Sequence, residues 1–310
     1  MCKAAGDCIG RKRWGALLLL WLLWVGVGTA AAQEVPIRVV ASFSILADLV
    51  AQVGGEAVTV KSLVGADGDA HVYEPLPADV VAVQSAQMFV VNGLGFEGWM
   101  QRLIKASDFR GLLVTASTGI QPLSLSRGPG VEPAEVADPH AWHDLRHVQV
   151  YVRNMAEGLA RLAPERSALF RANADRYQQE LVALDRWVRE VLATIPPERR
   201  TVISSHDAFG YFTQAYGVTF LAPVGVSSDA EPSAAQVAKL IGQIKKRKIK
   251  AIFLENRSNP RMVKQLIKES GAVLGGTLYT DALSTAEGPA PSFLAMVRHN
   301  VTALSRAMGD

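Results

Sequence analysis

Residues 37–64 have the sequence IRVVASFSILADLVAQVGGEAVTVKSLV, which contains a complete strand–helix–strand unit. The apolar run at 37–41 predicts a buried strand, and residues 45–53 have a helical spacing that ends at the glycine pair Gly54-Gly55. Residues 58–64 predict a second strand. Because a helix lies between the two strands, we expect them to pair in parallel, as in a βαβ unit.

The same alternation of strands and helices continues along most of the chain. Further strands are predicted at residues 88–91, 112–115, 201–204, 218–222, 251–254 and 272–278. Helices are predicted between them, among them 96–106 and 260–270. Residues 117–138 interrupt this rhythm with prolines and glycines, and they are predicted to form a long surface loop. The pattern is typical of an α/β protein with parallel sheets.

The middle of the chain, residues 144–196, has helical spacing throughout. Its second helix, predicted at 165–195, would be roughly 45 Å long at a rise of about 1.5 Å per residue. Such a helix is too long for a single crossover and suits a rigid connection between two domains. We therefore predict two α/β lobes, each a parallel sheet flanked by helices, joined by one long backbone helix. The lobes would span residues 33–143 and 197–310, with the helical segment 144–196 between them.

Residues 1–32 have the features of a secretory signal peptide. Four basic residues precede the apolar run 15–28, and Ala30-Ala31-Ala32 supplies the small residues needed for cleavage after Ala32. A membrane anchor is the alternative, because residues 15–32 carry no charge and approach the length of a membrane span. No basic run follows this stretch, which favours cleavage and a soluble periplasmic protein. No Cys stands at the cleavage point to carry a lipid.

Removal of the signal peptide changes the charge balance and the cysteine content. The chain has 32 basic and 29 acidic residues, of which four basic and one acidic lie in residues 1–32, so 28 of each remain. A balanced charge does not indicate a nucleic-acid partner. The two cysteines, Cys2 and Cys8, leave with the signal peptide. Any metal site in the mature chain must therefore use imidazole and carboxylate ligands.

Three histidines and one aspartate lie where ligands collect in parallel sheets. His71, His140, His206 and Asp281 all come shortly after a predicted strand or after the loop that follows one, and ligands bind at the carboxyl ends of such strands. Two of the four belong to each lobe, so they could converge in the cleft between the lobes. Three imidazoles and a carboxylate form a ligand set suited to Zn²⁺. Taken singly, each His could be a surface group and Asp281 a helix cap.

The motifs around these four residues carry a resemblance to a known family. They are His71-Val-Tyr-Glu-Pro75, Asp138-Pro-His-Ala-Trp142, Ser204-Ser-His-Asp-Ala-Phe-Gly-Tyr-Phe212 and Thr280-Asp281, joined by Asn92-Gly-Leu-Gly-Phe-Glu-Gly-Trp99 and Phe253-Leu-Glu255. In order and content they resemble the zinc/manganese-type (TroA-like, cluster A-I or cluster 9) solute-binding proteins of ABC transporters. The resemblance implies two α/β lobes joined by a long helix. It also implies that the metal ligands are His71, His140, His206 and Asp281.

The same resemblance bears on which metal is bound. Family members of the manganese type tend to have Glu where this chain has His206, and a nitrogen donor favours zinc over the harder Mn²⁺. We therefore expect one Zn²⁺ per chain. Two features depart from the zinc receptors: residues 117–137 contain no His, whereas many of these receptors have a His-rich loop there, and the mature chain cannot form the disulfide that some of them carry.

These observations predict capture of zinc in the periplasm and delivery to an ABC importer. The expected partner is the permease in the inner membrane, with a periplasmic zinc chaperone as a further candidate, and the protein is expected to be a monomer. The alternatives are a manganese or mixed-metal receptor, and a metal-binding adhesin or buffer without a transporter. A zinc hydrolase is disfavoured, because a fourth protein ligand closes the metal and the chain lacks H-E-x-x-H and G-x-S-x-G motifs. We therefore do not expect an enzyme.

Several other residues could have either a functional or a purely structural role. Glu74, Glu97 and Glu255 are candidates to orient the imidazoles or balance charge, although each could be a surface or capping carboxylate. His143 and His147 follow His140 at helical spacing and could form a second metal site, but we expect them on a solvated first turn. The glycine pattern at 93–98 resembles a dinucleotide fingerprint, and we interpret it as a tight turn because no acidic residue ends the next strand.

Overall fold

A computed structural model describes residues 35–125, 136–226, 232–256 and 260–309. The predicted signal peptide, residues 1–32, lies outside these ranges. None of the helices within the described residues is both long enough and apolar enough to cross a membrane.

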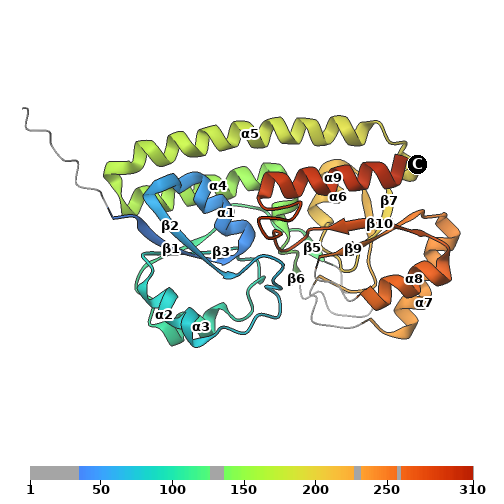
Figure 1. The fold of residues 1–310 in the computed structure, drawn as a ribbon, viewed down its shortest axis with the longest axis horizontal. Coiled ribbons are helices and arrows are strands. Elements are labelled where there is room, and N and C mark those ends of the chain that lie inside the picture. Colours follow the sequence, from blue (N-terminus) through green and yellow to red (C-terminus); the bar gives the residue numbers. More distant parts are fainter. Residues whose placement is uncertain (1–34, 126–135, 227–231, 257–259, 310) are drawn as a thin grey trace, which may run out of the picture. The chain divides into compact units, whose positions relative to one another are not determined.

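The first sheet forms as the opening βαβ unit predicts. β1 (Ile37–Phe43) pairs in parallel with β2 (Val58–Val64), with Ile37 opposite Val58, and α1 (Ser44–Gly54) connects them. β3 (Met88–Val91) and β4 (Leu112–Thr115) complete a four-stranded parallel sheet in the order β2-β1-β3-β4. Its other two helices are α2 (Pro77–Ser85) and α3 (Met100–Ser107). We call the described part of residues 35–143 the first lobe (Figure 1).

α3 is shorter than the helix predicted at 96–106, because the chain first makes a tight turn. Gly93, Leu94 and Gly95 have φ values of 84°, 55° and 81°, so three consecutive residues lie in the left-handed region, where glycine fits best. The turn interpretation of residues 93–98 agrees with this geometry.

The second sheet repeats the topology of the first. β7 (Thr201–Ile203), β8 (Thr219–Leu221), β9 (Ala251–Glu255) and β10 (Val273–Leu278) pair in parallel in the order β10-β9-β7-β8. In both sheets the spatial order of the strands is second, first, third and fourth. The helices of this region are α6 (Gly210–Tyr216), α7 (Ala234–Arg247), α8 (Pro260–Ser270) and α9 (Phe293–Gly309). We call the described part of residues 197–309 the second lobe.

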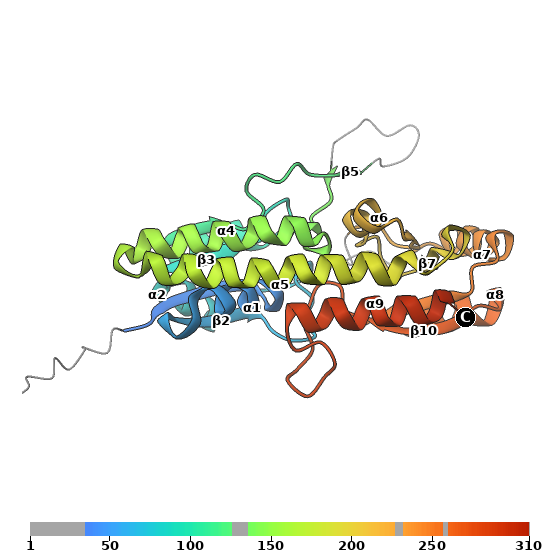
Figure 2. The same ribbon diagram turned by 90° about the horizontal axis from the view of Figure 1, so that it is seen from above.

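Two helices form the middle of the chain, α4 (Leu145–Leu162) and α5 (Ser167–Ala193). α5 has 27 residues, which corresponds to about 40 Å. One face of α5 is buried at intervals of three or four residues, at Phe170, Ala174, Tyr177, Leu181, Leu184, Val188 and Leu192. This face packs on α4 and α1 near one end and on α9 near the other, as Figures 1 and 2 show. A single stiff helix therefore contacts elements that flank both sheets.

The core is divided unequally. The larger cluster of buried side chains combines the first sheet with α4, α5, α6 and α9. A smaller cluster fills the space between the second sheet and its two helices α7 and α8, and consists mainly of Ile203, Leu240, Ile244, Ile252, Val263 and Leu266. The side of the second sheet that faces α9 thus shares its core with the first lobe, whereas the opposite side has its own.

The predicted loop at 117–138 is not wholly irregular. Ser124–Leu125 (β5) and Val136–Ala137 (β6) pair as short antiparallel strands. The sequence between them lies outside the described residues. The pairing brings the chain back to Asp138, two residues before His140.

Candidate metal centre

The structure brings together the four residues that the sequence analysis selected. His71 follows β2, His140 follows β6, His206 follows β7 directly and Asp281 follows β10. One potential ligand atom from each lies within 4.8 Å of the other three. All four side chains are largely withdrawn from solvent, with exposed fractions of 10% or less. Strand ends of the two four-stranded sheets supply three donors, and the short β5–β6 pair supplies His140, so that all four meet at one buried point.

The separations between the donor atoms fit coordination of one cation. Nε2 of His71 lies 3.2 Å from Nε2 of His140 and 3.5 Å from Oδ2 of Asp281. Nε2 of His206 lies 3.3 Å from Oδ2 of Asp281, and Nε2 of His140 lies 3.6 Å from Oδ1. A tetrahedral zinc with bonds of about 2.0–2.1 Å would hold its ligands about 3.3 Å apart.

Two of these atoms also lack a hydrogen bond. Nε2 of His206 and Oδ1 of Asp281 are buried, and neither makes a hydrogen bond of good geometry to any described residue. Leaving a buried polar atom unpaired costs about 1–3 kcal/mol. A divalent cation between them would remove this cost, so the donors present fit a metal ion.

An aspartate two residues before the histidine holds the backbone of both His71 and His140, and at His140 it also orients the ring. Oδ1 of Asp138 accepts hydrogen bonds from the backbone N–H of His140 at 2.9 Å and from its Nδ1 at 2.8 Å. Oδ1 of Asp69 accepts the backbone N–H of His71 at 3.0 Å. Both contacts use the local turn that an Asp side chain forms with the N–H two residues later. Neither aspartate was assigned a role from the sequence, although the repeated Asp-x-His spacing at 69–71 and 138–140 is visible there.

Glu255 performs the equivalent task for His206. Its carboxylate accepts the backbone N–H groups of Ser205 at 2.8 Å and of His206 at 3.0 Å, and it also accepts Nδ1 of His206 at 2.5 Å. With Nδ1 occupied by a carboxylate, Nε2 is the nitrogen that remains for a metal. Such carboxylate–histidine pairs fix the ring orientation and increase its basicity as a ligand.

Glu97 acts through an intermediate residue. Its buried carboxyl group accepts the hydroxyl of Ser42 at 2.7 Å and the backbone N–H groups of Asn92 and Gly93 at 2.6 and 3.2 Å. Nδ2 of Asn92 in turn donates to the carbonyl of Pro139 at 2.9 Å, next to His140. Glu74, by contrast, is exposed, and within the described residues it makes no hydrogen bond to an imidazole.

The local charges oppose the effect of burial on both His206 and Asp281. Burial alone would lower the pKa of His206, but the charges of Glu255 and Asp281, with the hydrogen bond to Glu255, raise it well above its usual value. Burial alone would raise the pKa of Asp281, but the charge of His206, with smaller contributions from His71 and His140, lowers it well below its usual value. The negative field of these carboxylates favours a cation at the centre.

The expectation that His143 lies on a solvated turn is wrong. His143 is buried, with its ring 4.6 Å from that of Phe209, because aromatic residues around the start of α6 pack over the short 3-10 turn Ala141–His143 that precedes α4. Burial, with a smaller contribution from His140, lowers the pKa of His143 to about 3, so the ring is neutral. His147 is half-buried against Tyr211. Among the described residues, neither histidine belongs to the cluster of four donors.

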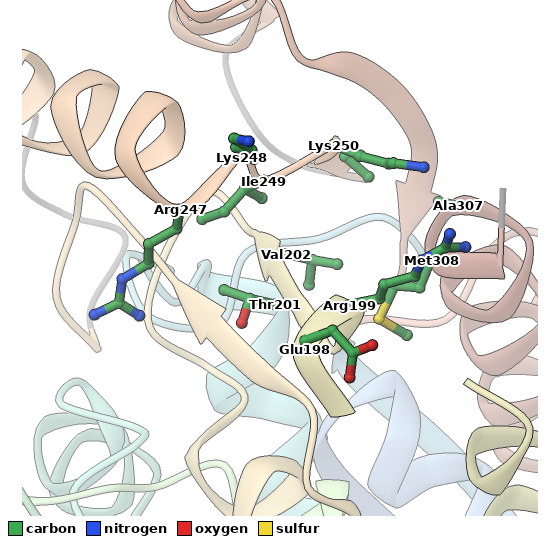
Figure 3. Close-up of a pocket in the computed structure, with 11 residues that line it drawn as sticks. Glu198, Arg199, Thr201, Val202, Arg247, Lys248, Ile249, Lys250, Ala307 and Met308 are labelled. Atoms are coloured by element: carbon green, nitrogen blue, oxygen red, sulfur yellow. The ribbon is translucent and has the colours of Figure 1, made fainter. Parts of the chain in front are cut away.

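A hollow away from the four donors lies at the other end of the second sheet. It has a volume of about 320 Å³ and lies at the amino ends of β7 and β9 (Figure 3), whereas the four donors follow the carboxyl ends of their strands. Its rim carries four cationic side chains, three of which, Arg247, Lys248 and Lys250, extend away from one another. These charges would repel a divalent cation, so the hollow does not compete as a metal site.

Comparisons with known proteins agree with this geometry. A family model described as zinc-uptake complex component A, periplasmic, matches residues 39–307. The manganese-binding lipoprotein MntA of Halalkalibacterium halodurans is 34% identical over 266 residues, which are 86% of each chain. The zinc-binding protein TroA of Treponema pallidum is 32% identical over 288 residues, which are 91% of this chain and 92% of that one. The solved structure of this periplasmic zinc-binding protein superposes with a TM-score of 0.81, covering 88% of this chain and 99% of the other.

The orienting role of Glu255 gives a first prediction. Glu255→Gln keeps the size of the side chain but removes its charge, so the affinity for Zn²⁺ should fall by about 10- to 100-fold, as for other partners of ligating histidines. Glu74→Gln is the matched control, and it should leave the affinity unchanged because Glu74 is exposed. Competitive titration against a chelator measures both. Equal affinities in the two variants would contradict the role of Glu255.

Proposed function

The chain belongs to the zinc-uptake complex component A family, and we propose that it captures Zn²⁺ in the periplasm and delivers it to an ABC importer. Members of this family are the metal-binding receptors of ABC transporters and are not enzymes. The observation that carries the proposal is the buried cluster of His71, His140, His206 and Asp281. Its donors come from both lobes, so binding of the ion would hold the two lobes together.

The identity of the metal is the finer part of the proposal. The relatives include zinc-binding, manganese-binding and iron-binding proteins at similar identity, 32% for TroA, 34% for MntA and 32% for YfeA of Yersinia pestis, so similarity alone does not select a metal. Three imidazoles and one carboxylate favour Zn²⁺ over Mn²⁺, which prefers oxygen ligands. The nitrogen of His206 is the donor on which this preference depends. A manganese or mixed-metal receptor is the second candidate.

A cluster of four protein donors suits a carrier. A catalytic zinc usually keeps three protein ligands and an open position for water. Here the fourth donor, Asp281, lies within 3.3–3.6 Å of the three imidazole nitrogens and would occupy that position. We therefore propose one Zn²⁺ per chain, bound as cargo through His71, His140, His206 and Asp281.

We further propose that the chain is exported and processed. Cleavage after Ala32 would release a mature protein that begins at Gln33, acts as a monomer and meets its permease at the inner membrane. A periplasmic zinc chaperone could supply the ion. Sequencing the N-terminus of the protein recovered from the periplasmic fraction tests the cleavage, and an intact N-terminus in washed membranes would contradict it.

Replacement of His206 tests both the site and the choice of metal. His206→Ala removes one nitrogen donor, and zinc affinity should fall by more than the roughly 10- to 100-fold that is typical of residues behind the ligands. His206→Glu should shift the preference toward Mn²⁺, because a carboxylate suits that ion better. His147→Ala is the control and should bind like the parent, since His147 lies outside the cluster. Competition titrations with both metals measure these effects, and parent-like zinc binding by His206→Ala would refute the assignment.

The pH dependence of binding should follow His206. The metal needs the neutral ring, and the raised pKa of His206 means that the metal-free protein holds a proton there at pH values where a free imidazole, with its pKa near 6.5, is mostly neutral. As the pH falls through this raised pKa, binding must displace the proton, and the affinity should drop by about tenfold per pH unit.

This dependence is measured by titration with a chelator whose own protonation is corrected for. In Glu255→Gln the fall should move to lower pH, because the charge of Glu255 contributes to the raised pKa. An affinity that stays constant between pH 8 and pH 6 would argue against a site built on His206.

A further inference from the structure

The loop that carries Asp281 belongs to the second lobe by sequence and is attached to the first lobe as well. Nε1 of Trp142 donates to the carbonyl of Thr280 at 2.8 Å. The backbone N–H of Leu283 donates to the hydroxyl of Ser44 at 2.9 Å, and its carbonyl accepts the backbone N–H of Asp67 at 2.9 Å. Hydrogen bonds from the first lobe therefore hold this loop on both sides of Asp281.

His206 is held in a different way, by its own lobe. Glu255, at the end of β9, accepts both the backbone N–H and Nδ1 of His206. Just before this ligand, the backbone N–H of Ser204 donates to the carbonyl of Leu221 in the neighbouring strand β8 at 3.1 Å. His206 and Glu255 thus form a unit that would move with the second sheet.

Asp67 connects these two arrangements. Its backbone N–H holds the Asp281 loop through Leu283, and its Oδ1 accepts Nδ2 of Asn256, the residue next to Glu255, at 2.9 Å. Asp67 also lies in the same loop as His71 and has a φ of 53°, which only a few residue types adopt readily. Asp67 is therefore connected to the segments of three ligands. It shares a loop with His71 and holds the Asp281 loop through Leu283. It also contacts Asn256, the neighbour of Glu255, whose carboxylate orients His206.

Asn256 has its own anchor in the second sheet. Its backbone N–H donates to the carbonyl of Leu278 at 3.0 Å, between the ends of β9 and β10. Its Oδ1 is buried and has no hydrogen-bond partner among the described residues, so the described pairing of the side-chain amide is through Nδ2 to Asp67. The position of this amide is therefore defined by a contact between the lobes.

We propose that Asp67 is a positioning residue for metal release: its bond to Asn256 fastens the His206–Glu255 unit against the first lobe and must open before the ion leaves. This inference rests on the proposed function as a metal receptor. The first lobe still holds the Asp281 loop through Ser44 and Trp142 when the bond opens. Loss of the Asp67 carboxylate then accelerates dissociation of the ion and leaves its capture unchanged.

The test uses four single variants of the chain and the double variant Asp67→Gly/Asn256→Ala, each loaded with one Zn²⁺. Asp67→Gly removes the carboxylate, and glycine adopts the φ of 53° without strain, so the backbone bond to Leu283 is kept. Asp67→Asn keeps an acceptor oxygen and tolerates the same backbone conformation. Asn256→Ala removes the donor. Asp108→Gly is the matched control, since Asp108 has a φ of 46° in the first lobe and pairs with Arg110 away from the four ligands.

The rates of zinc release into excess chelator and of zinc capture are measured separately by stopped flow. Release should be about tenfold faster in Asp67→Gly and in Asn256→Ala, the usual scale for one hydrogen bond to a charged group. The double variant should be no faster than either single one, since both remove the same bond. Capture should stay at the parent rate in every variant. Asp67→Asn should release zinc at a rate between those of the parent and Asp67→Gly, because the amide oxygen keeps the hydrogen bond without its charge. Asp108→Gly should release zinc within about twofold of the parent rate, well below the tenfold that the bond of Asp67 is worth.

Two results would overturn the role of Asp67 and leave the receptor function intact. They are release at the parent rate in a zinc-loaded Asp67→Gly protein, and additive effects in the double variant. Equal slowing of capture and acceleration of release would also refute it, because a general loosening of the fold changes both rates. If the parent chain itself retains neither zinc nor manganese, the proposed function fails, and this inference fails with it.

Discussion

The burial of Asp281 is the constraint on which the rest of the structure depends. A carboxylate removed from water is costly unless opposite charges and hydrogen bonds compensate. Here three imidazoles surround it, and Nε2 of His206 approaches to 3.3 Å. Two of these imidazoles are hydrogen-bonded through Nδ1 to further buried carboxylates, Asp138 and Glu255. Three carboxylates around one point are balanced most simply by a divalent cation, so the whole arrangement is organised for an ion.

The fold meets this constraint with two four-stranded parallel sheets of the same topology. Each four-stranded parallel sheet directs its carboxyl ends toward the cluster. Loops after β2, β7 and β10 carry three of the ligands, and His140 lies at the end of the longer connection that follows β4. α5 contacts helices beside both sheets, and its continuous buried face limits how far they can separate. Motion in such a molecule is therefore expected at the hydrogen bonds between the lobes. A small displacement of the lobes would change the positions of the ligands most directly at three contacts with the second lobe, those of Asp67, Ser44 and Trp142.

Much of this architecture was predictable from local sequence patterns. β2, β3, β4 and α8 occupy the residues that the apolar spacing predicted, and most other elements differ by one or two residues at their ends. The two-lobe α/β fold with a long connecting helix is confirmed by the match to the solved zinc-binding protein. The four candidate ligands were found because they follow strands and lie in recognisable motifs, and their role as ligands stays a prediction. α3 began later than predicted because a left-handed turn at Gly93–Gly95 is a backbone property that apolar periodicity does not show.

The sequence by itself determined the elements, their order and the four donors, because these depend on periodicity and on residues close along the chain. Only the tertiary structure decided which polar side chains support the donors. Asp67 and Asn256 are 189 positions apart, and Ser44 and Leu283 are 239 positions apart, so no local pattern could pair them. His143 illustrates the same limit: its surroundings are supplied by Phe209 from the second lobe. A polar residue in a loop has the same local sequence whether it faces water or a partner, and long-range packing alone distinguishes the two.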